Sequence, residues 1–210
     1  MVDLKSHWEK VYQTKRPTEV SWFQPHLAQS LEIISRMDFD RNVEIIDIGG
    51  GASALVDDLL NHGYRHMTVL DMSQEALNIS KRRLGGQSKN VTWIEGDITA
   101  VDLPQHHYDL WHDRAVFHFL TRADERYRYM DILKKTLKPG GHVIIATFGP
   151  QGPTHCSGLD VARYSPEGLL AELGQNFKLA ESLEEDHKTP GGTAQKFIYC
   201  HFIRGSSNAK

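Results

Sequence analysis

The sequence has little of what marks secreted, membrane-bound or metal-binding proteins. It contains only two cysteines, Cys156 and Cys200, far apart and without a C-x-x-C pair, which predicts reduced thiols, no metal site and a cytoplasmic protein. The first sixteen residues carry six charges and no apolar run, so neither a secretory signal nor a membrane anchor is expected. Internal repeats and low-complexity segments are also missing.

An excess of one charge sign is missing as well. The chain has 24 Lys and Arg against 27 Asp and Glu, a net charge of -3, and its densest basic run is Lys81–Arg83 on a predicted helix. This balance argues against nucleic-acid or membrane partners, and a solvated helix face is the better interpretation of the run. With 210 residues, 40% of them hydrophobic, the chain predicts one soluble globular domain, and the lack of an obvious exposed apolar stripe favours a monomer.

Short apolar runs alternate with amphipathic stretches from residue 43 onward. Strands are predicted at 43–48, 67–70, 91–94, 108–112 and 142–148, separated by helical patterns. Ser73 and Thr121 are the predicted helix caps, and Lys138–Gly141 is predicted to end the preceding helix before the fifth strand. The pattern predicts an α/β fold: a Rossmann-like doubly wound, mostly parallel sheet with helices on both faces.

The last quarter of the chain has a different pattern. A sixteen-residue loop, 149–164, precedes a short helix that Ser165 opens and Gly174 ends. Segments 177–183 and 196–204 predict a C-terminal antiparallel hairpin, and 205–210 predicts a disordered tail.

The glycine turn Gly49–Gly51 is the strongest local signal for a ligand site. Its missing side chains let a ligand approach the backbone, and the helix that follows from Ser53 offers free N–H groups. Gly49-x-Gly51-x-x-Ala54, with Asp71 about 20 residues on, also fits the dinucleotide fingerprint. An NAD-binding oxidoreductase is therefore one hypothesis.

Carboxylates at the ends of three successive strands point to a different ligand. Asp47 precedes the glycine turn, where it can receive the ammonium group of a zwitterionic ligand, and the dinucleotide fingerprint does not require it. Asp71 can bind ribose hydroxyls, and Asp97 with the following backbone can meet an adenine amino group.

Residues 40–150 resemble the class I S-adenosylmethionine-dependent methyltransferases. The motifs are Asp47-Ile-Gly-Gly-Gly51, the ribose acid Asp71, Gly96-Asp97-Ile98, and Leu137-Lys-Pro-Gly-Gly141. The resemblance implies S-adenosylmethionine as the cofactor, bound by Tyr12, Trp22, Asp47, Gly49, Gly50, Gly51, Ser53, Asp71, Met72, Asp97, Ile98 and Asp113.

A narrower resemblance lies outside this core. His7-Trp8-Glu-Lys-Val-Tyr12, Trp22-Phe23-Gln24, and Asp113-Arg114 before Arg126-x-x-Tyr129 are similar to segments of thiopurine and related thiol S-methyltransferases. It implies one domain, 1–204, with an aromatic lid segment at 1–40, a cofactor-binding core at 41–150, and a substrate loop and hairpin at 151–204. Similar aromatic lead-ins occur in protein lysine methyltransferases, and a helix simply packed on the sheet is the structural alternative.

The expected reaction is methyl transfer to a small-molecule nucleophile, a thiol or another soft atom. Asp113, Arg114 and His118 are the catalytic candidates: Arg114 to steer an anionic acceptor, His118 as a base with a pKa near neutrality. The other interpretation of His118 is a buried structural histidine. Trp8, Phe23, Arg114, His155 and Cys156 are the candidate substrate residues. A protein lysine methyltransferase, the NAD-binding oxidoreductase and a non-catalytic cofactor-binding module are the alternatives.

Overall fold

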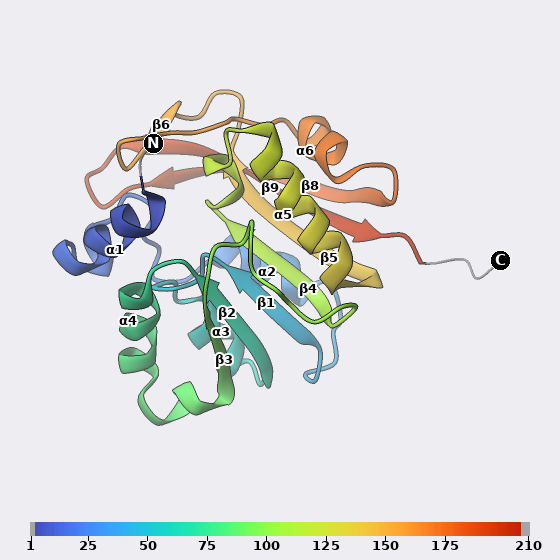
Figure 1. Cartoon of the computed structure of the whole chain (residues 1–210), viewed down its shortest axis with the longest axis horizontal. Helices are drawn as coiled ribbons and strands as arrows, with labels where there is room; N and C mark the ends of the chain where they lie inside the picture. Colours follow the sequence, from blue (N-terminus) through green and yellow to red (C-terminus); the bar gives the residue numbers. More distant parts are fainter. Residues whose placement is uncertain (1–2, 207–210) are drawn as a thin grey trace.

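The computed structural model describes residues 3–206, which contain a seven-stranded sheet (Figure 1). Its strands are β1 (Glu44–Ile48), β2 (His66–Asp71), β3 (Val91–Glu95), β4 (Tyr108–Arg114), β5 (Leu137–Phe148), β8 (Phe177–Lys188) and β9 (Ala194–Arg204). The order is β3-β2-β1-β4-β5-β9-β8; the first five are parallel, and β9 runs antiparallel to both β5 and β8. The predicted mostly parallel sheet with a C-terminal hairpin is confirmed.

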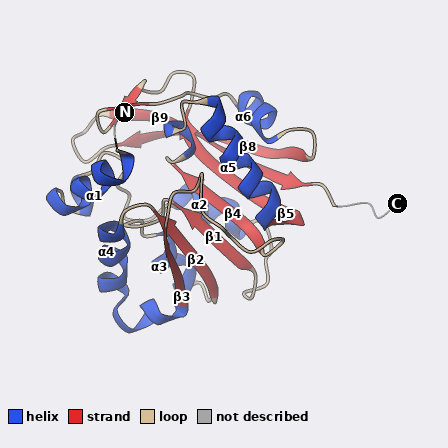
Figure 2. Ribbon diagram, in the orientation of Figure 1, coloured by secondary structure: helices blue, strands red, loops and turns tan. Residues whose placement is uncertain are grey.

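Helices cover both faces of the sheet, as predicted (Figure 2). One face carries α2 (Ala28–Ser35), α3 (Leu55–Asn61) and α4 (Gln74–Leu84); the other carries α5 (Ala123–Thr136) and α6 (Pro166–Leu173). Figure 1 shows α5 in front of the sheet and α2 and α3 behind it. The N-terminal helix α1 (Leu4–Thr14) packs on α4. Within residues 3–206, no helix is long and apolar enough to cross a bilayer.

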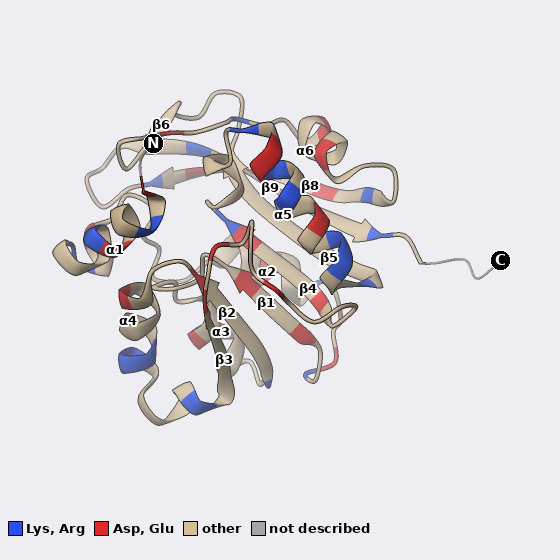
Figure 3. Cartoon of the chain, in the orientation of Figure 1, with Lys and Arg blue, Asp and Glu red and all other residues tan. Residues whose placement is uncertain are grey.

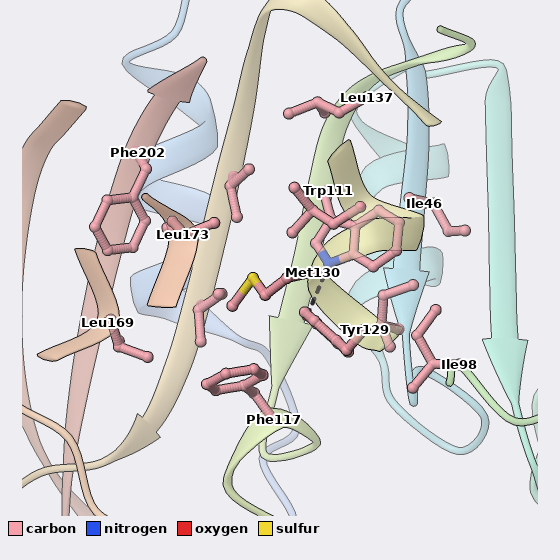
Figure 4. Packing of buried hydrophobic residues seen from close by; sticks show 14 of the residues in the cluster. Ile46, Ile98, Trp111, Phe117, Tyr129, Met130, Leu137, Leu169, Leu173 and Phe202 are labelled. Atoms are coloured by element: carbon pink, nitrogen blue, oxygen red, sulfur yellow. Dashed lines mark hydrogen bonds between the residues drawn. The ribbon is translucent and has the colours of Figure 1, made fainter. Parts of the chain in front are cut away.

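The core between the sheet and α5 contains one buried polar chain (Figure 4). The Trp111 indole N–H on β4 donates to the Tyr129 hydroxyl on α5 at 2.8 Å, and that hydroxyl donates to Asp113 at 2.7 Å. Both aromatic rings are fully buried, which stabilises the fold by roughly 1.5 to 3 kcal/mol for each large apolar side chain. The hydrogen bonds remove the penalty of burying their polar atoms.

Two of the three predicted helix starts are confirmed. The Ser73 hydroxyl accepts the N–H of Ala76 and the Ser165 hydroxyl accepts that of Gly168, so each caps its helix. The Thr121 cap is wrong: α5 begins at Ala123, and Thr121 N–H instead donates to Phe119 O in the turn after η3 (Phe117–Phe119).

The predicted end of the helix before Lys138–Gly141 is confirmed, because α5 ends at Thr136, but the fifth strand begins earlier than predicted, at Leu137. The first residues of β5 pair irregularly with β4. The register between the two strands shifts between Tyr108 and Leu110, and Gly140 takes a left-handed φ of 78°.

The loop 149–164 carries a small hairpin that the sequence did not predict. Strands β6 (His155–Cys156) and β7 (Leu159–Asp160) are joined by Ser157 and Gly158, both at positive φ, as a tight two-residue turn requires. Of the predicted tail, 207–210 lies outside the described residues, and Gly205 N–H donates to Asn176 O at 2.7 Å.

Lys and Arg are interspersed with Asp and Glu over the helices and edge strands (Figure 3). In the Lys81–Arg83 run, Arg82 pairs with Glu75 and Arg83 with Asp57, both at 2.6 Å. The run is therefore the charged, paired helix face that the sequence predicted.

Candidate functional site

The glycine turn after β1 is packed so tightly that none of its three residues has room for a side chain. A Cβ on Gly49 would lie 2.1 Å from Val116 Cγ2, and one on Gly50 would lie 2.2 Å from Asp47 Oδ2. On Gly51 it would lie 2.5 Å from both Asp71 Oδ2 and the Ala76 methyl. Gly49 also has a left-handed φ of 68°. The backbone of the turn, free of side chains, thus lies between two carboxylates.

Asp47 is buried at the end of β1 with one oxygen unsatisfied. Its Oδ1 lies 2.7 Å from His112 Nδ1 on β4, whereas Oδ2 has no hydrogen-bond partner among the described residues. A buried ionised oxygen without a donor is costly, so this position is prepared for a ligand donor.

Asp71, at the end of β2, holds the turn from the other side. Its Oδ2 accepts the N–H of Gly51 at 3.0 Å and its Oδ1 accepts that of Ser73 at 2.8 Å. Burial raises the pKa of Asp71 to about 6, against the opposing effect of these two hydrogen bonds. Each carboxylate oxygen keeps a lone pair for a ligand hydroxyl.

Two adjoining cavities open on these carboxylates. The glycine-turn cavity, about 500 Å³, is lined among others by Phe23, Asp47, Gly50 and Ser53. The aromatic cavity, about 770 Å³, is lined among others by Trp8, Asp71, Met72, Ile98, Phe119 and Cys156. Both are lined by Tyr12, Trp22, Ile48, Gly49 and Arg114, which therefore mark their junction.

Aromatic side chains of the N-terminal segment cover this junction. Trp8 makes edge-on contacts with Trp22 and Phe119, with ring centroids 5.5 and 5.0 Å apart. Glu9 fastens α1 to α4, accepting the Ser73 hydroxyl at 2.7 Å and the Glu75 N–H at 3.3 Å. The segment is therefore both a packed helix and a cavity wall.

Arg114, the last residue of β4, is held from three sides. It donates to the Tyr199 hydroxyl at 2.7 Å and to Trp22 O at 2.9 Å, and its Nη2 lies 3.8 Å from Glu185. Nη2 has no hydrogen-bond partner among the described residues, and the side chain is 6% exposed. The glycine-turn cavity thus offers an unpaired acceptor on Asp47 and an unpaired donor on Arg114.

Besides Gly51 and Asp97, three predicted site residues line neither cavity, and they are Asp113, His155 and His118. Asp113 is fully buried, with Oδ1 accepting the N–H groups of Val116 and Phe117, so it shapes the turn after β4 instead of meeting a ligand. Burial raises its pKa to about 6. His155 is exposed and pairs with Asp160 at 2.8 Å.

His118 is the third. It is fully buried, stacked on Phe148 at 4.6 Å between ring centroids, and neither ring nitrogen has a partner among the described residues. Burial, helped by the charge of Arg114, lowers its pKa to about 3, so the expected near-neutral pKa is wrong. The geometry does not favour His118 as a base.

Asp97 lies beside the aromatic cavity rather than in it. It lines an adjoining groove with Asp3, Glu95, Gly96, Glu125 and Asp160, which we call the acidic groove. Asp97 is exposed, and one oxygen accepts the N–H and hydroxyl of Thr99, both at 2.8 Å.

Sequence reasoning missed four polar residues around the site: Ser30, His112, Glu185 and Tyr199. His112 lines the glycine-turn cavity, and the other three support His112 or Arg114. One signal was available, because His112 is a polar residue that directly follows the apolar Leu110 and Trp111 in the predicted fourth strand.

The cavities fit S-adenosylmethionine, which has a zwitterionic amino-acid end and an adenosine end. Asp47 Oδ2, which has no hydrogen-bond partner within residues 3–206, matches an ammonium group in the glycine-turn cavity. Asp71 and Ile98 match a ribose and an apolar ring in the aromatic cavity.

Comparisons with known proteins agree with this fit. Residues 45–141 match the family model described as a methyltransferase domain. The chain is 29% identical over 132 residues to malonyl-[acyl-carrier protein] O-methyltransferase 2 of Ilyobacter polytropus, covering 62% of this chain and 49% of that protein. It is 21% identical to EEF1A lysine methyltransferase 2 of Danio rerio, covering 90% and 81%.

A solved structure shares the fold. The Burkholderia thailandensis 1,6-didemethyltoxoflavin-N1-methyltransferase, with bound 1,6-didemethyltoxoflavin and S-adenosylhomocysteine, superposes with a TM-score of 0.69 at 18% identity, covering 97% of this chain and 88% of that chain. The chain spans about half or less of the length of the first curated relatives it matches. Residues 45–141, slightly less than half of the chain, are thus similar to a methyltransferase domain, and the fold is one that solved methyltransferase structures share.

Proposed function

We propose that the protein transfers a methyl group from S-adenosylmethionine to a small-molecule nucleophile, a thiol or another soft atom. The observation that carries this proposal is the buried Arg114 at the junction of the two cavities, where the reacting atoms meet. Residues 1–204 act as one catalytic unit, with 1–40 as lid, 41–150 as core and 151–204 as substrate loop and hairpin.

The donor occupies both cavities in this proposal. Asp47 and Gly49–Gly51 hold its amino-acid end, with Ser53 nearby, and Asp71 accepts the ribose hydroxyls. Met72 and Ile98 pack on the adenine, while Asp97 reaches its rim from the acidic groove. S-adenosylmethionine supplies an already electrophilic methyl group, so the chain's task is to align donor and acceptor and to exclude water.

Arg114 gives the junction a positive field that favours an anionic nucleophile. Burial raises the pKa of the neighbouring Cys156 thiol, whereas the hydrogen bond to Ser21 and the charge of Arg114 act to lower it. For a thiol acceptor placed there, the charge of Arg114 likewise favours the thiolate, the nucleophilic form, against the opposing effect of burial. Trp8, Tyr12, Trp22 and Cys156 enclose the space, which suits a small acceptor and keeps water out.

Protein lysine methylation is the second candidate. The similarity to a curated lysine methyltransferase extends over most of both chains, and the acidic groove adjoins the aromatic cavity through Leu4, Met72 and Phe119. A cationic lysine would be attracted by the groove but repelled by Arg114.

The alternative of an NAD-binding oxidoreductase loses support. The dinucleotide-binding fold has the strand order 3-2-1-4-5-6, whereas here an antiparallel β9 lies between β5 and β8.

Two measurements test the proposal. Calorimetric titration with S-adenosylhomocysteine, with NADH as control, should show micromolar binding of the former alone. Incubation with methyl-labelled S-adenosylmethionine and a panel of thiols, selenols and basic peptides should then place label in the thiol products. Label on peptide lysine would establish the second candidate, and binding without any turnover would indicate a non-catalytic cofactor-binding module.

A further inference from the structure

A buried hydrogen-bonded chain runs from α2 to the glycine-turn cavity through three residues. Ser30 Oγ on α2 lies 2.8 Å from His112 Nε2 on β4, and His112 Nδ1 lies 2.7 Å from Asp47 Oδ1 on β1. Ser30 and His112 are fully buried, and Asp47 is 2% exposed. Such a chain, with every member but the last oxygen satisfied, fixes the side chains that form it.

The chemistry of the end group sets the direction of these bonds. An ionised carboxylate only accepts hydrogen bonds, so His112 Nδ1 carries the proton toward Asp47. In the neutral imidazole, Nε2 then accepts the hydroxyl proton of Ser30. The remaining oxygen, Asp47 Oδ2, lies beside Gly50 and has no hydrogen-bond partner in the described part of the chain.

The order Ser–His–Asp is also that of a hydrolase triad, but the placement is different. The Ser30 hydroxyl is buried and lies outside both cavities, where a substrate carbonyl cannot reach it. Asp47 and His112, not Ser30, are the members that line the glycine-turn cavity. The group of this hydrogen-bonded series that can meet a ligand is therefore the Asp47 carboxylate.

We propose that Ser30 and His112 are positioning residues that hold Asp47 with Oδ2 turned into the cavity, where it binds the ammonium group of the donor. This inference rests on the proposed function. A carboxylate held by one oxygen cannot rotate away from its ligand, so the bond to His112 lowers the cost of ordering Asp47 on binding. The hydrogen bonds from Ser30 through His112 to Asp47 thus favour donors that have an amino-acid end.

The test compares two ligands that differ at that end. S-adenosylhomocysteine has the ammonium group; 5′-methylthioadenosine keeps the ribose and adenine but lacks the amino-acid end. In His112→Asn, the side-chain amide N–H can replace Nδ1–H toward Asp47. In His112→Gln, the longer side chain places its amide toward Ser30 instead.

Calorimetry should show that His112→Gln binds S-adenosylhomocysteine at least about tenfold more weakly, the effect of losing one charge-assisted hydrogen bond. His112→Asn should stay within about threefold of the wild type, and both variants should bind methylthioadenosine as the wild type does. Thermal unfolding establishes that each variant is folded. Ser30→Ala leaves Asp47 and His112 in place. This variant should bind S-adenosylhomocysteine about threefold or more weakly than the wild type and bind methylthioadenosine unchanged.

Equal weakening of both ligands, or no weakening of either, would overturn the positioning role and leave a purely structural hydrogen-bond chain. If the His112 variants do not fold, Ser30→Ala alone decides between these results. Failure of the wild type to bind either ligand would instead overturn the proposed function, so the two failures are distinguishable.

Discussion

Gly50→Ala should separate recognition of the amino-acid end of the donor from recognition of its adenosine end. The new Cβ would lie 2.2 Å from Asp47 Oδ2 and 2.5 Å from Cγ, so the carboxylate must retreat by at least 0.8 Å to reach a 3.0 Å contact. That movement takes Oδ1 away from His112 Nδ1, now at 2.7 Å. Losing one charge-assisted hydrogen bond to the ammonium group costs about 1.5 to 3 kcal/mol, or about ten- to a hundredfold in affinity.

The assay is calorimetric titration with S-adenosylhomocysteine and 5′-methylthioadenosine. Gly50→Ala should bind S-adenosylhomocysteine about ten- to a hundredfold more weakly, and methylthioadenosine less than about threefold more weakly. Gly51→Ala should weaken both, because its Cβ meets Asp71 Oδ2 and the Ala76 methyl at 2.5 Å. Gly86→Ala is the matched control, since nothing lies within 4 Å of its Cβ. A folded Gly50→Ala protein that binds S-adenosylhomocysteine normally would refute the reasoning.

Three further predictions concern single side chains. Burial raises the pKa of Asp71 to about 6. Because the ribose hydroxyls of the ligand donate to the ionised carboxylate, protonation of Asp71 weakens binding. The affinity for S-adenosylhomocysteine should therefore be constant above pH 7 and fall about tenfold per pH unit below 6. A flat calorimetric profile from pH 5 to 8 would contradict this assignment. Arg114→Gln should slow methylation of anionic thiols at least tenfold while Arg114→Lys keeps part of the rate; weaker binding of S-adenosylhomocysteine but not of methylthioadenosine would instead assign Arg114 to the donor's carboxylate. Because the pKa of His118 is lowered to about 3 and its ring stacks on Phe148, His118→Phe should retain the wild-type transfer rate, and a loss above a hundredfold would restore its role as base.

Features that depend on near neighbours in the chain were predictable. The strands at 44–48 and 91–95 follow from runs of apolar and β-branched residues, and the caps Ser73 and Ser165 act on N–H groups three residues away. The Thr121 cap failed for a local reason as well, since its backbone already belongs to the preceding turn.

The residues around the end of β4 show where such reasoning reaches its limit. Successive residues of a strand point to opposite faces, so Asp113 turns toward Tyr129 on α5 while His112 and Arg114 reach the glycine-turn cavity. The motif identified the correct end of β4, but not which of its side chains line the cavity. The sequence left two interpretations of His118 open, a base or a buried structural histidine, and its burial against Phe148 depends on β5, thirty residues later.

The sequence by itself determined the α/β class, the glycine turn and the three carboxylates at the strand ends, because spacing, turn chemistry and side-chain size act over a few residues. Only the tertiary structure decided that Ser30, Asp47 and His112 form one chain, and that Glu185 and Tyr199 hold Arg114. These partners are 14 to 85 residues apart in the chain and meet only because packing of the sheet and its helices brings them together, excluding the water that would otherwise satisfy them.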